Sequence, residues 1–495
     1  MTSKDEQQKT ISGIDVMRGV GIDRAKDFWA DAWDRVYRRP GAFCALVWIG
    51  IIGFFAIFSP LIANGLPIWL VQQNADGTTT ASSPLWQNLT ATDLMLLLGG
   101  FIGIPWILIP MKIGRGHRLG MLITLGILSG LIIVLASAVS GYFGDSGASR
   151  WAREIEQTAW FVPVSTSVIC IICGAGFLFI PFVDRILPRT VLVVVTCLLT
   201  GLAVGSRWNE PLINYEKYQE MAADGDARAW YTLVPWSPNE SRTDLYVVPP
   251  GLTVKEKLDE MSEKPFGDRQ FIMGTDGIGR DVLSQMMHAC RLSISIGLIS
   301  TGIAVLIGVT LGALMGYFGG IVDLLLYRLV EIFMAIPVLF LLIVAAAVLP
   351  RNTYVMMIII GCVAWTGAAR FTRAEFLKLR SQDFVQSARA VGLPLRSILF
   401  KHMLPNGVTP VLVDSSFAIA SAILFEATLS FLGLGPEGQA SWGKLLSSAT
   451  GVTGTFVWWL AIFPGLAIFL TVLAYNLLGE AFRDAIDPKL RKAAH

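Results

Sequence analysis

The sequence predicts an all-α polytopic membrane protein with about ten transmembrane helices. Of its 495 residues, 54% are hydrophobic and 15% are charged, whereas a soluble globular protein carries roughly 25% charged residues. The hydrophobic residues occur in blocks of about 20, the length at which a helix spans a hydrocarbon layer about 30 Å thick. These observations exclude a soluble enzyme.

Ten hydrophobic blocks are long enough to be candidate spans, and their order along the chain sets the expected architecture. They lie at about 41–62, 93–111, 119–141, 159–183, 190–205, 290–318, 324–349, 354–371, 407–432 and 456–479. The six cysteines lie in or beside these blocks, so the sequence predicts no disulfide framework.

Lysine and arginine predict the orientation of these spans, because short cytoplasmic loops carry an excess of both residues. Basic side chains cluster before the first span, between the second and third, between the fourth and fifth, after the eighth and after the tenth: Arg35, Arg38, Arg39, Lys112, Arg115, Arg118, Arg185, Arg189, Arg370, Arg373, Lys378, Arg380, Arg389, Arg396, Lys401, Arg483, Lys489, Arg491 and Lys492. With ten spans, all these segments fall on one side of the membrane. Both termini are therefore expected to be cytoplasmic.

Residues 1–40 are predicted to be a cytoplasmic N-terminal segment that contains an interfacial amphipathic helix. Within 24–39, bulky apolar side chains fall on one helical face and the charged side chains lie mostly off it. The apolar side chains are Phe28, Trp29, Trp33, Val36 and Tyr37. Such a helix lies along the membrane surface, and Pro40 ends it before the first span, 41–62.

Two longer polar segments, 63–92 and 206–270, are expected on the extracytoplasmic side. The second carries 12 acidic and 8 basic side chains with Trp and Pro interspersed. It is long enough to form a small ordered module, and a plain connector fits its composition equally well.

The chain lacks the residues that would let it drive chemistry by itself. No phosphate-binding G-x-x-x-x-G-K-[ST] loop occurs, and the four histidines are scattered. Three carboxylates, Glu331, Asp414 and Glu426, lie within apolar blocks, where each costs roughly 2.5–3.5 kcal/mol unless it faces protein or water. Glu331 is one turn from Arg328 and is expected to pair with it. Glu426 is expected either to line the outer mouth of a translocation path or to pair with a nearby basic side chain, and Asp414 either to reach the cytoplasmic surface or to contact substrate in that path.

The cytoplasmic stretch 376–406 is predicted to form two short helical pieces separated by Gly392 and Pro394. Small residues on the first piece would let another protein approach closely, and Val385, Ala388 and Val391 form an apolar stripe at helical spacing. A short helix of this kind suits insertion into a groove on a partner.

This stretch resembles the EAA loop of ABC-importer permeases, which couples the membrane subunit to an ATPase. The family pattern is Glu-Ala-Ala, three residues, Gly, and later Ile and Leu-Pro. This chain has Gln386-Ser387-Ala388, Gly392, Ile398 and Leu404-Pro405, so Gln386 and Ser387 depart from the pattern. The departure bears on a charge contact to the ATPase and leaves the small-residue surface in place. The resemblance implies coupling roles for Asp383, Gln386, Ser387, Ala388, Arg389, Gly392, Arg396, Leu404 and Pro405.

A second stretch, Gly274-Thr275-Asp276-Gly277-Ile278-Gly279-Arg280-Asp281, is similar to the GTDxxGRD element of peptide-type permeases. Together with motifs at 426–435 and 483–490, it makes the chain similar to the C-type permease subunit of dipeptide and oligopeptide ABC importers over about 265–492 and 28–62. Asp276, Arg280 and Asp281 are expected either to lock a tight turn by a local ion pair or to dock a substrate-binding protein.

The resemblance implies an ABC type I importer permease core of six helices, with four more inserted. The expected domains are the first core helix at 41–62, the insert at 63–205, an extracytoplasmic segment at 206–289, five core helices with the coupling loop at 290–482, and a cytoplasmic tail at 483–495. Gly308, Gly312 and Gly316 allow close packing of helix backbones, either within this chain or against a second permease.

The resemblance also implies the mechanism, which is alternating access driven by the ATPase through the 383–405 loop. The implied partners are a homologous permease, two ATP-binding subunits and an extracytoplasmic binding protein, with no nucleic acid. The implied location is the inner membrane of a bacterium. No cofactor is expected in this chain, since ATP and Mg would be held by the ATPase subunits. Dipeptides, oligopeptides, nickel chelates, glutathione and peptide antibiotics all remain open as substrates. The alternatives are an ion-driven secondary transporter that uses Glu331, Asp414 and Glu426 as relay groups, and an assembly factor in which the insert is the functional part.

Overall fold

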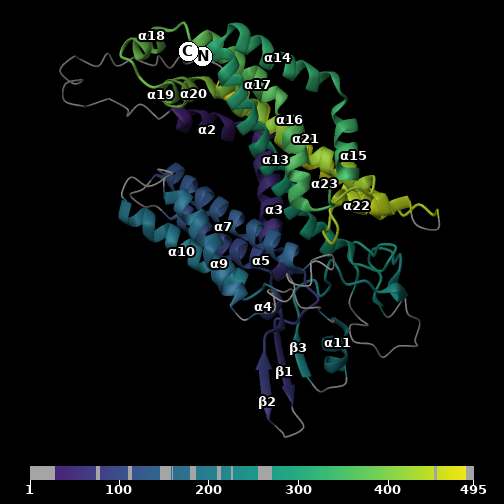
Figure 1. Cartoon of the computed structure of the whole chain (residues 1–495). Coiled ribbons are helices and arrows are strands. Elements are labelled where there is room, and N and C mark those ends of the chain that lie inside the picture. Colours follow the sequence, from purple (N-terminus) through teal and green to yellow (C-terminus); the bar gives the residue numbers. More distant parts are fainter. Residues whose placement is uncertain are drawn as a thin grey trace, which may run out of the picture.

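The computed structural model describes residues 28–73, 78–109, 114–144, 158, 160–178, 186–208, 213, 215–223, 227–254, 270–450 and 454–486. This described part of the chain is mostly helical (Figure 1). It contains eight helices long and apolar enough to cross a membrane, or up to ten if each of two bent helix pairs counts as one span. The predicted helical membrane class and the expected number of spans are confirmed.

The helices that qualify as spans are α3 (Pro40–Ile62), the continuous run of α5 (Ala91–Leu98), η1 (Gly99–Gly103) and α6 (Ile104–Leu108), α7 (Arg115–Gly144), α9 (Phe161–Leu178), α10 (Ile186–Gly205), α13 (Val282–Phe318), α21 (Thr409–Phe431) and α23 (Trp458–Ile486). The bent pairs are α14 (Gly320–Ala335) with α15 (Val338–Val348), and α16 (Thr353–Ala364) with α17 (Thr366–Leu379). The shorter helices are α2 (Phe28–Arg38), α4 (Pro84–Asn88), α11 (Tyr215–Ala223), η2 (Thr243–Leu245), α18 (Asp383–Ala390), α19 (Leu395–Ser397), η3 (Ile398–Met403), α20 (Leu404–Gly407), α22 (Trp442–Ser447) and η4 (Ser448–Thr450).

The block predicted as one span at 324–349 is not a single helix. It consists of α14 and α15, which meet at an angle of 83°. Pro337 has no backbone N–H and disfavours a helical conformation of the preceding residue, and Ile336 is accordingly extended. The block predicted at 354–371 is longer than expected, because α16 and α17 continue it to Leu379 with a bend of 42°.

The central helix of the core is α13, which packs against α3, α16, α17 and α21. Gly308, Gly312 and Gly316 line its contact with α17, where a Cβ on Gly312 would lie 2.5 Å from the carbonyl oxygen of Ala369. These three glycines therefore allow close packing within this chain, one of the two predicted alternatives.

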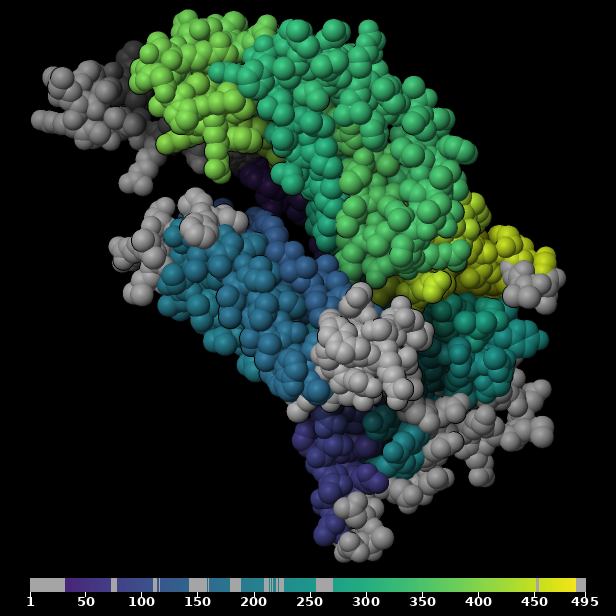
Figure 2. Space-filling view, viewed as in Figure 1, coloured from purple at the N-terminus to yellow at the C-terminus, as the bar shows by residue number. Residues whose placement is uncertain are grey.

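Helices α5 to α10 form a separate bundle beside the core, which we call the lateral bundle. Leu128, Ile132, Ile169 and Val193 are buried together inside it. Figure 2 shows the bundle in blue as a mass beside the green core helices. It meets the core at α3, where Gly100 lies so close to Ile57 that a Cβ would approach its side chain to 2.8 Å.

The described parts of the two polar segments pack together in one module, which we call the sheet end of the molecule. Strands β1 (Trp69–Gln73), β2 (Thr79–Ser82) and β3 (Ala227–Trp230) make an antiparallel sheet in the order β2-β1-β3, with Trp69 opposite Trp230. Trp236 and Phe271 stack in a separate buried cluster of this module, with ring centroids 4.9 Å apart. Strand β1, assigned from the sequence to the insert, thus pairs with β3 in the segment that follows the insert.

The opposite end, which carries α18 to α20, is called the short-helix end; α2 also lies there (Figure 1). The predicted amphipathic helix is confirmed over Phe28–Arg38, whereas residues 24–27 lie outside the described residues. Val36 is fully buried against the end of α23, and Arg39 pairs with Asp484 at 2.5 Å. Part of the apolar face therefore packs on the chain itself.

Candidate functional site

The loop between α17 and α21 is anchored to the core by the inner face of α18. Val385 is fully buried and Ala388 nearly so, in a cluster with Phe376 and Leu379 of α17. The predicted apolar stripe is thus divided: these two residues face the chain itself, while Val391 is 78% exposed. Val385 and Ala388 are buried because an eight-residue helix stays folded mainly by packing its apolar face against the rest of the chain.

The chain leaves α18 at the predicted break. Gly392 has a positive φ of 78°, its N–H donates to the carbonyl of Arg389 at 2.9 Å, and the Leu393 N–H donates to Ala388 at 3.1 Å. This is the Schellman arrangement, in which glycine adopts the left-handed conformation that ends a helix. At its other end α18 begins at Asp383, which lies in the first turn, and Gln382 occupies the N-cap position.

The outer surface of the loop combines exposed apolar and basic side chains. The exposed apolar residues are Phe384, Val391, Leu393, Leu395 and Phe400. Asp383, Ser387, Arg396 and Pro405 are exposed as well, whereas Leu404 is half-buried. Exposed apolar side chains grouped on one loop are typical of a protein interaction surface.

Two residues predicted to face a partner also contact this chain. The Gln386 side-chain amide donates to the carbonyl of Arg380 at 3.0 Å. The Arg389 guanidinium lies over the ring of Tyr317, 4.5 Å from its centroid. Neither contact is visible in the sequence, because Arg380 takes part through its backbone and Tyr317 belongs to the distant helix α13.

An ion pair that sequence analysis missed joins α17 to α14. The Arg373 guanidinium contacts both carboxylate oxygens of Asp323, at 2.5 and 2.7 Å, and also lies over the ring of Tyr327. A two-point contact of this kind fixes orientation as well as distance. The ends of α13, α14, α17 and α18 are therefore tied into one frame.

At the sheet end, the Asp276–Asp281 turn has the structural role that was one of the two predictions. Arg280 pairs with Asp276 at 2.8 Å, and Asp276 also accepts the backbone N–H groups of Ile278 and Arg280. Asp281 caps α13 by accepting the Ser284 N–H at 2.6 Å. Burial raises the pKa of the Asp281 carboxyl to about 7.

The two carboxylates of this turn are enclosed by the chain itself, whereas Arg280 is half-buried. Asp276 is 1% exposed and Asp281 is 3% exposed, and the oxygens of both accept hydrogen bonds from this chain. Carboxylates enclosed in this way hold the turn, and docking of a substrate-binding protein at this turn stays a prediction.

Among the described residues, Glu426 contacts serine hydroxyls and no basic side chain, and a role in a translocation path stays a prediction. Glu426 is fully buried, and one carboxylate oxygen accepts the hydroxyl groups of Ser430 and Ser441 at 2.7 Å each. Ser441 is the N-cap residue of α22. Glu426 therefore joins α21 to α22, which is a structural role that its position in the sequence did not indicate.

The other two intramembrane carboxylates differ from Glu426. Glu331 pairs with Arg328 at 2.5 Å on an exposed surface, as expected. Asp414 is half-buried on α21 and faces α17, where a Cβ on Gly367 would lie 3.1 Å from its carboxylate. The three carboxylates thus occupy separate environments, and a role for Asp414 in a path stays a prediction.

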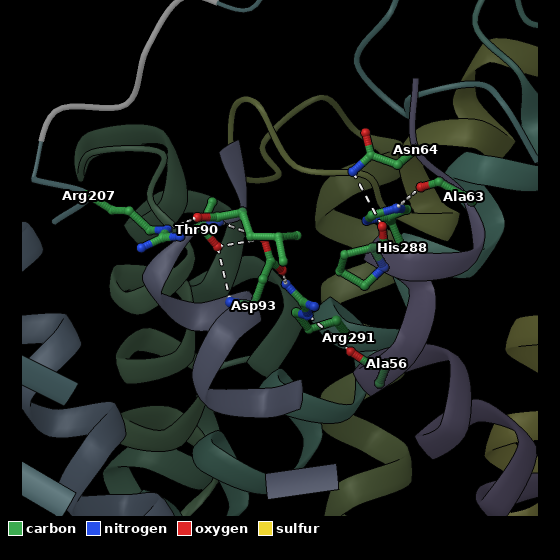
Figure 3. Close-up of polar contacts among 10 residues, drawn as sticks. Ala56, Ala63, Asn64, Thr90, Asp93, Arg207, His288 and Arg291 are labelled. Atoms are coloured by element: carbon green, nitrogen blue, oxygen red, sulfur yellow. Dashed lines mark hydrogen bonds and ion pairs between the residues drawn. The ribbon is translucent and has the colours of Figure 1, made fainter. Parts of the chain in front are cut away.

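A polar joint fastens the lateral bundle to the core (Figure 3). Arg291 of α13 pairs with Asp93 of α5 at 2.5 Å and donates to the carbonyl of Ala56 at 3.0 Å. That carbonyl is available because Pro60, four residues later, has no N–H to donate to it. Asp93 also forms a capping box with Thr90. The feature of the sequence that could have indicated this pair is a charged residue, Asp93 or Arg291, at the start of each of two apolar blocks.

Comparison with known proteins gives matches at both ends of the chain. Residues 308–492 match the family described as binding-protein-dependent transport system inner membrane component, and residues 27–81 match the N-terminal TM domain of oligopeptide transport permease C. The chain is 39% identical to the oligopeptide transport system permease protein OppC of Haemophilus influenzae, over 47% of this chain and 74% of that protein. It is 36% identical to the di/tripeptide transport system permease protein DppC of Pseudomonas aeruginosa, over 53% and 83%.

The matches extend beyond these two relatives. The chain is 40% identical to the peptidoglycan transport system permease protein YejE of Agrobacterium fabrum, over 44% of this chain and 57% of that protein. Among solved structures, a chain of the MetNI methionine ABC transporter in an inward-facing conformation is similar, with 15% identity, a TM-score of 0.34, and coverage of 41% of this chain and 97% of that one. Residues 82–307 lie between the two matched family segments.

Proposed function

Because this chain belongs to the family of binding-protein-dependent transport system inner membrane components, we propose that it forms half of the translocation path of an ABC importer for peptides. The relatives that support this substrate class are named as oligopeptide and di/tripeptide permeases. The relatives are permease subunits, so ATP and Mg are held by separate ATP-binding subunits.

The observation that carries the proposal is the two-sided construction of α18. Its inner face is buried against α17, and its outer surface presents apolar side chains to solvent, with Val391 78% exposed. An ATPase that binds the outer surface would therefore move α17 and α13 with it. We propose that ATP binding and hydrolysis drive alternating access through this contact.

The arrangement in the membrane follows from this assignment. The short-helix end is cytoplasmic and receives the two ATPase subunits, and both termini are cytoplasmic. The sheet end is extracytoplasmic and meets the substrate-binding protein. The core consists of six spans paired with a homologous permease in a bacterial inner membrane, and the four spans of the lateral bundle are an addition to it.

The ion-driven alternative is not favoured by the positions of the carboxylates. Relay groups must exchange protons or ions along a continuous route. Glu331 is paired at an exposed surface, and Glu426 is enclosed by two serines. Of the three carboxylates, Asp414 alone is half-buried and has neither a surface ion pair like that of Glu331 nor serine contacts like those of Glu426.

The test is ATPase association and uptake by the assembled complex. Val391→Asp places a charge on the outer surface of the short-helix loop without touching the buried face of α18. Leu233→Asp is the matched control, because Leu233 is 87% exposed at the sheet end. We expect Val391→Asp to lose co-purifying ATPase and ATP-dependent peptide uptake in liposomes, and Leu233→Asp to keep the co-purifying ATPase. Uptake driven by a proton gradient without the ATPase would contradict the proposal.

A further inference from the structure

We propose that Gln386 is a positioning residue, which fixes the angle between α18 and α17 by donating its side-chain amide to the backbone of α17. This inference rests on the proposed function, since it concerns how movement passes between this chain and an ATPase. It assigns Gln386 an inward role in place of a contact to the partner.

The end of α17 explains why a donor is needed at this position. The last carbonyl groups of a helix have no partner within the helix and must be satisfied by other groups. Here each is covered in turn: Ser381 Oγ donates to Lys378, the Gln382 N–H donates to Leu379, and Gln386 Nε2 donates to Arg380, each at 3.0 Å. Gln386 therefore supplies the third member of a series that closes α17.

The chemistry of this hydrogen bond requires a side chain with an N–H donor. An ionised carboxylate only accepts hydrogen bonds, whereas the glutamine amide carries two N–H donors. A glutamate at position 386 would set its negative charge against the carbonyl oxygen of Arg380. The departure from the EAA pattern at this position is therefore accounted for by a bond within the chain.

The hydrogen bond has mechanical value because of the contact at the other end of α18. Arg389 lies over Tyr317 and ties the end of the helix to α13, while Gln386 ties its first half to α17. Val385 and Ala388 fill the space between. With a tie to two different core helices, an eight-residue helix cannot pivot about its buried face, so a push on its outer surface reaches α13 and α17 together. When a bound ATPase excludes water, an unpaired Arg380 carbonyl would carry the full cost of its desolvation.

The experiment compares Gln386→Ala and Gln386→Glu with Gln386→Lys, which keeps an N–H donor, in the complete complex with its partner permease, ATPases and binding protein. Gln382→Ala is the control, because Gln382 is exposed in the same loop and makes its contacts here through its backbone. The measurements are co-purifying ATPase and the number of substrate molecules imported per ATP hydrolysed. We expect Gln386→Ala and Gln386→Glu to lower this ratio by about three- to ten-fold, the effect of losing one hydrogen bond, with ATPase association unchanged.

The two control variants should keep the wild-type ratio. An unchanged ratio in Gln386→Glu would overturn the inference, and so would loss of ATPase association in parallel with the ratio, because Gln386 would then be a docking contact. Failure of the wild-type complex to import with ATP would instead refute the proposed function, so the two outcomes are distinguishable.

Discussion

Replacing Gly312 with alanine tests whether the contact between α13 and α17 depends on the glycine series. A Cβ at this position would lie 2.5 Å from the carbonyl oxygen of Ala369 and 2.7 Å from the Cβ of Thr372, whereas ordinary contacts begin at 3.4 Å. The two helices would have to separate by about 1 Å to restore normal van der Waals distances. Overpacking of this kind costs about 1–3 kcal/mol.

Gly302 on the same helix provides the matched control. A Cβ there meets no atom within 4 Å, so Gly302→Ala changes the helix propensity without a clash. Alanine is favoured over glycine in a helix by about 1 kcal/mol, and this gain is common to both variants. The difference in unfolding free energy between the two variants therefore isolates the steric cost.

The assay is denaturant unfolding of the two variants in mixed micelles under identical conditions. We expect Gly312→Ala to be less stable than Gly302→Ala by about 1–3 kcal/mol. Equal stability within about 0.5 kcal/mol, the usual effect of an unconstrained surface change, would refute the close packing of α13 on α17.

Three further predictions concern the buried charges. The pKa of Asp281 is raised from 3.8 to about 7, so its contribution to stability is fully present below pH 4 and is lost as pH rises to 7. Asp281→Asn keeps an N-cap acceptor and should remove up to about 4 kcal/mol of the pH dependence of the unfolding free energy. Identical pH profiles for the variant and the wild type would contradict this prediction. Asp93→Ala and Arg291→Ala should show a coupling of about 1–3 kcal/mol in a double-mutant cycle of unfolding free energies, whereas additive effects would mean that the pair does not fasten the bundle. Glu426→Gln should keep ATP-driven uptake within about two-fold, because a carbonyl oxygen can still accept both serine hydroxyls, and abolished uptake with normal folding would instead indicate a proton relay.

The sequence by itself determined the membrane class, the number of spans and the place of the short-helix loop. These properties depend on contiguous residues: hydropathy over about 20 positions marks a span, and Gly392 ends α18 because only its own backbone conformation is involved. Pro337 could have indicated the bend between α14 and α15, but the continuous apolar block around it led to the prediction of a single span.

Only the tertiary structure decided which way the functional side chains face. Spacing placed Val385 and Gln386 on one short helix, but the tertiary structure determined that Val385 is buried against α17, while Gln386 stays exposed and donates to the Arg380 carbonyl. Likewise, the ion pair of Arg291 with Asp93 joins segments far apart in sequence, as does the pairing of β1 with β3. Such contacts are set by how whole elements pack, since a polar group removed from water must find its partner wherever the fold brings one within reach.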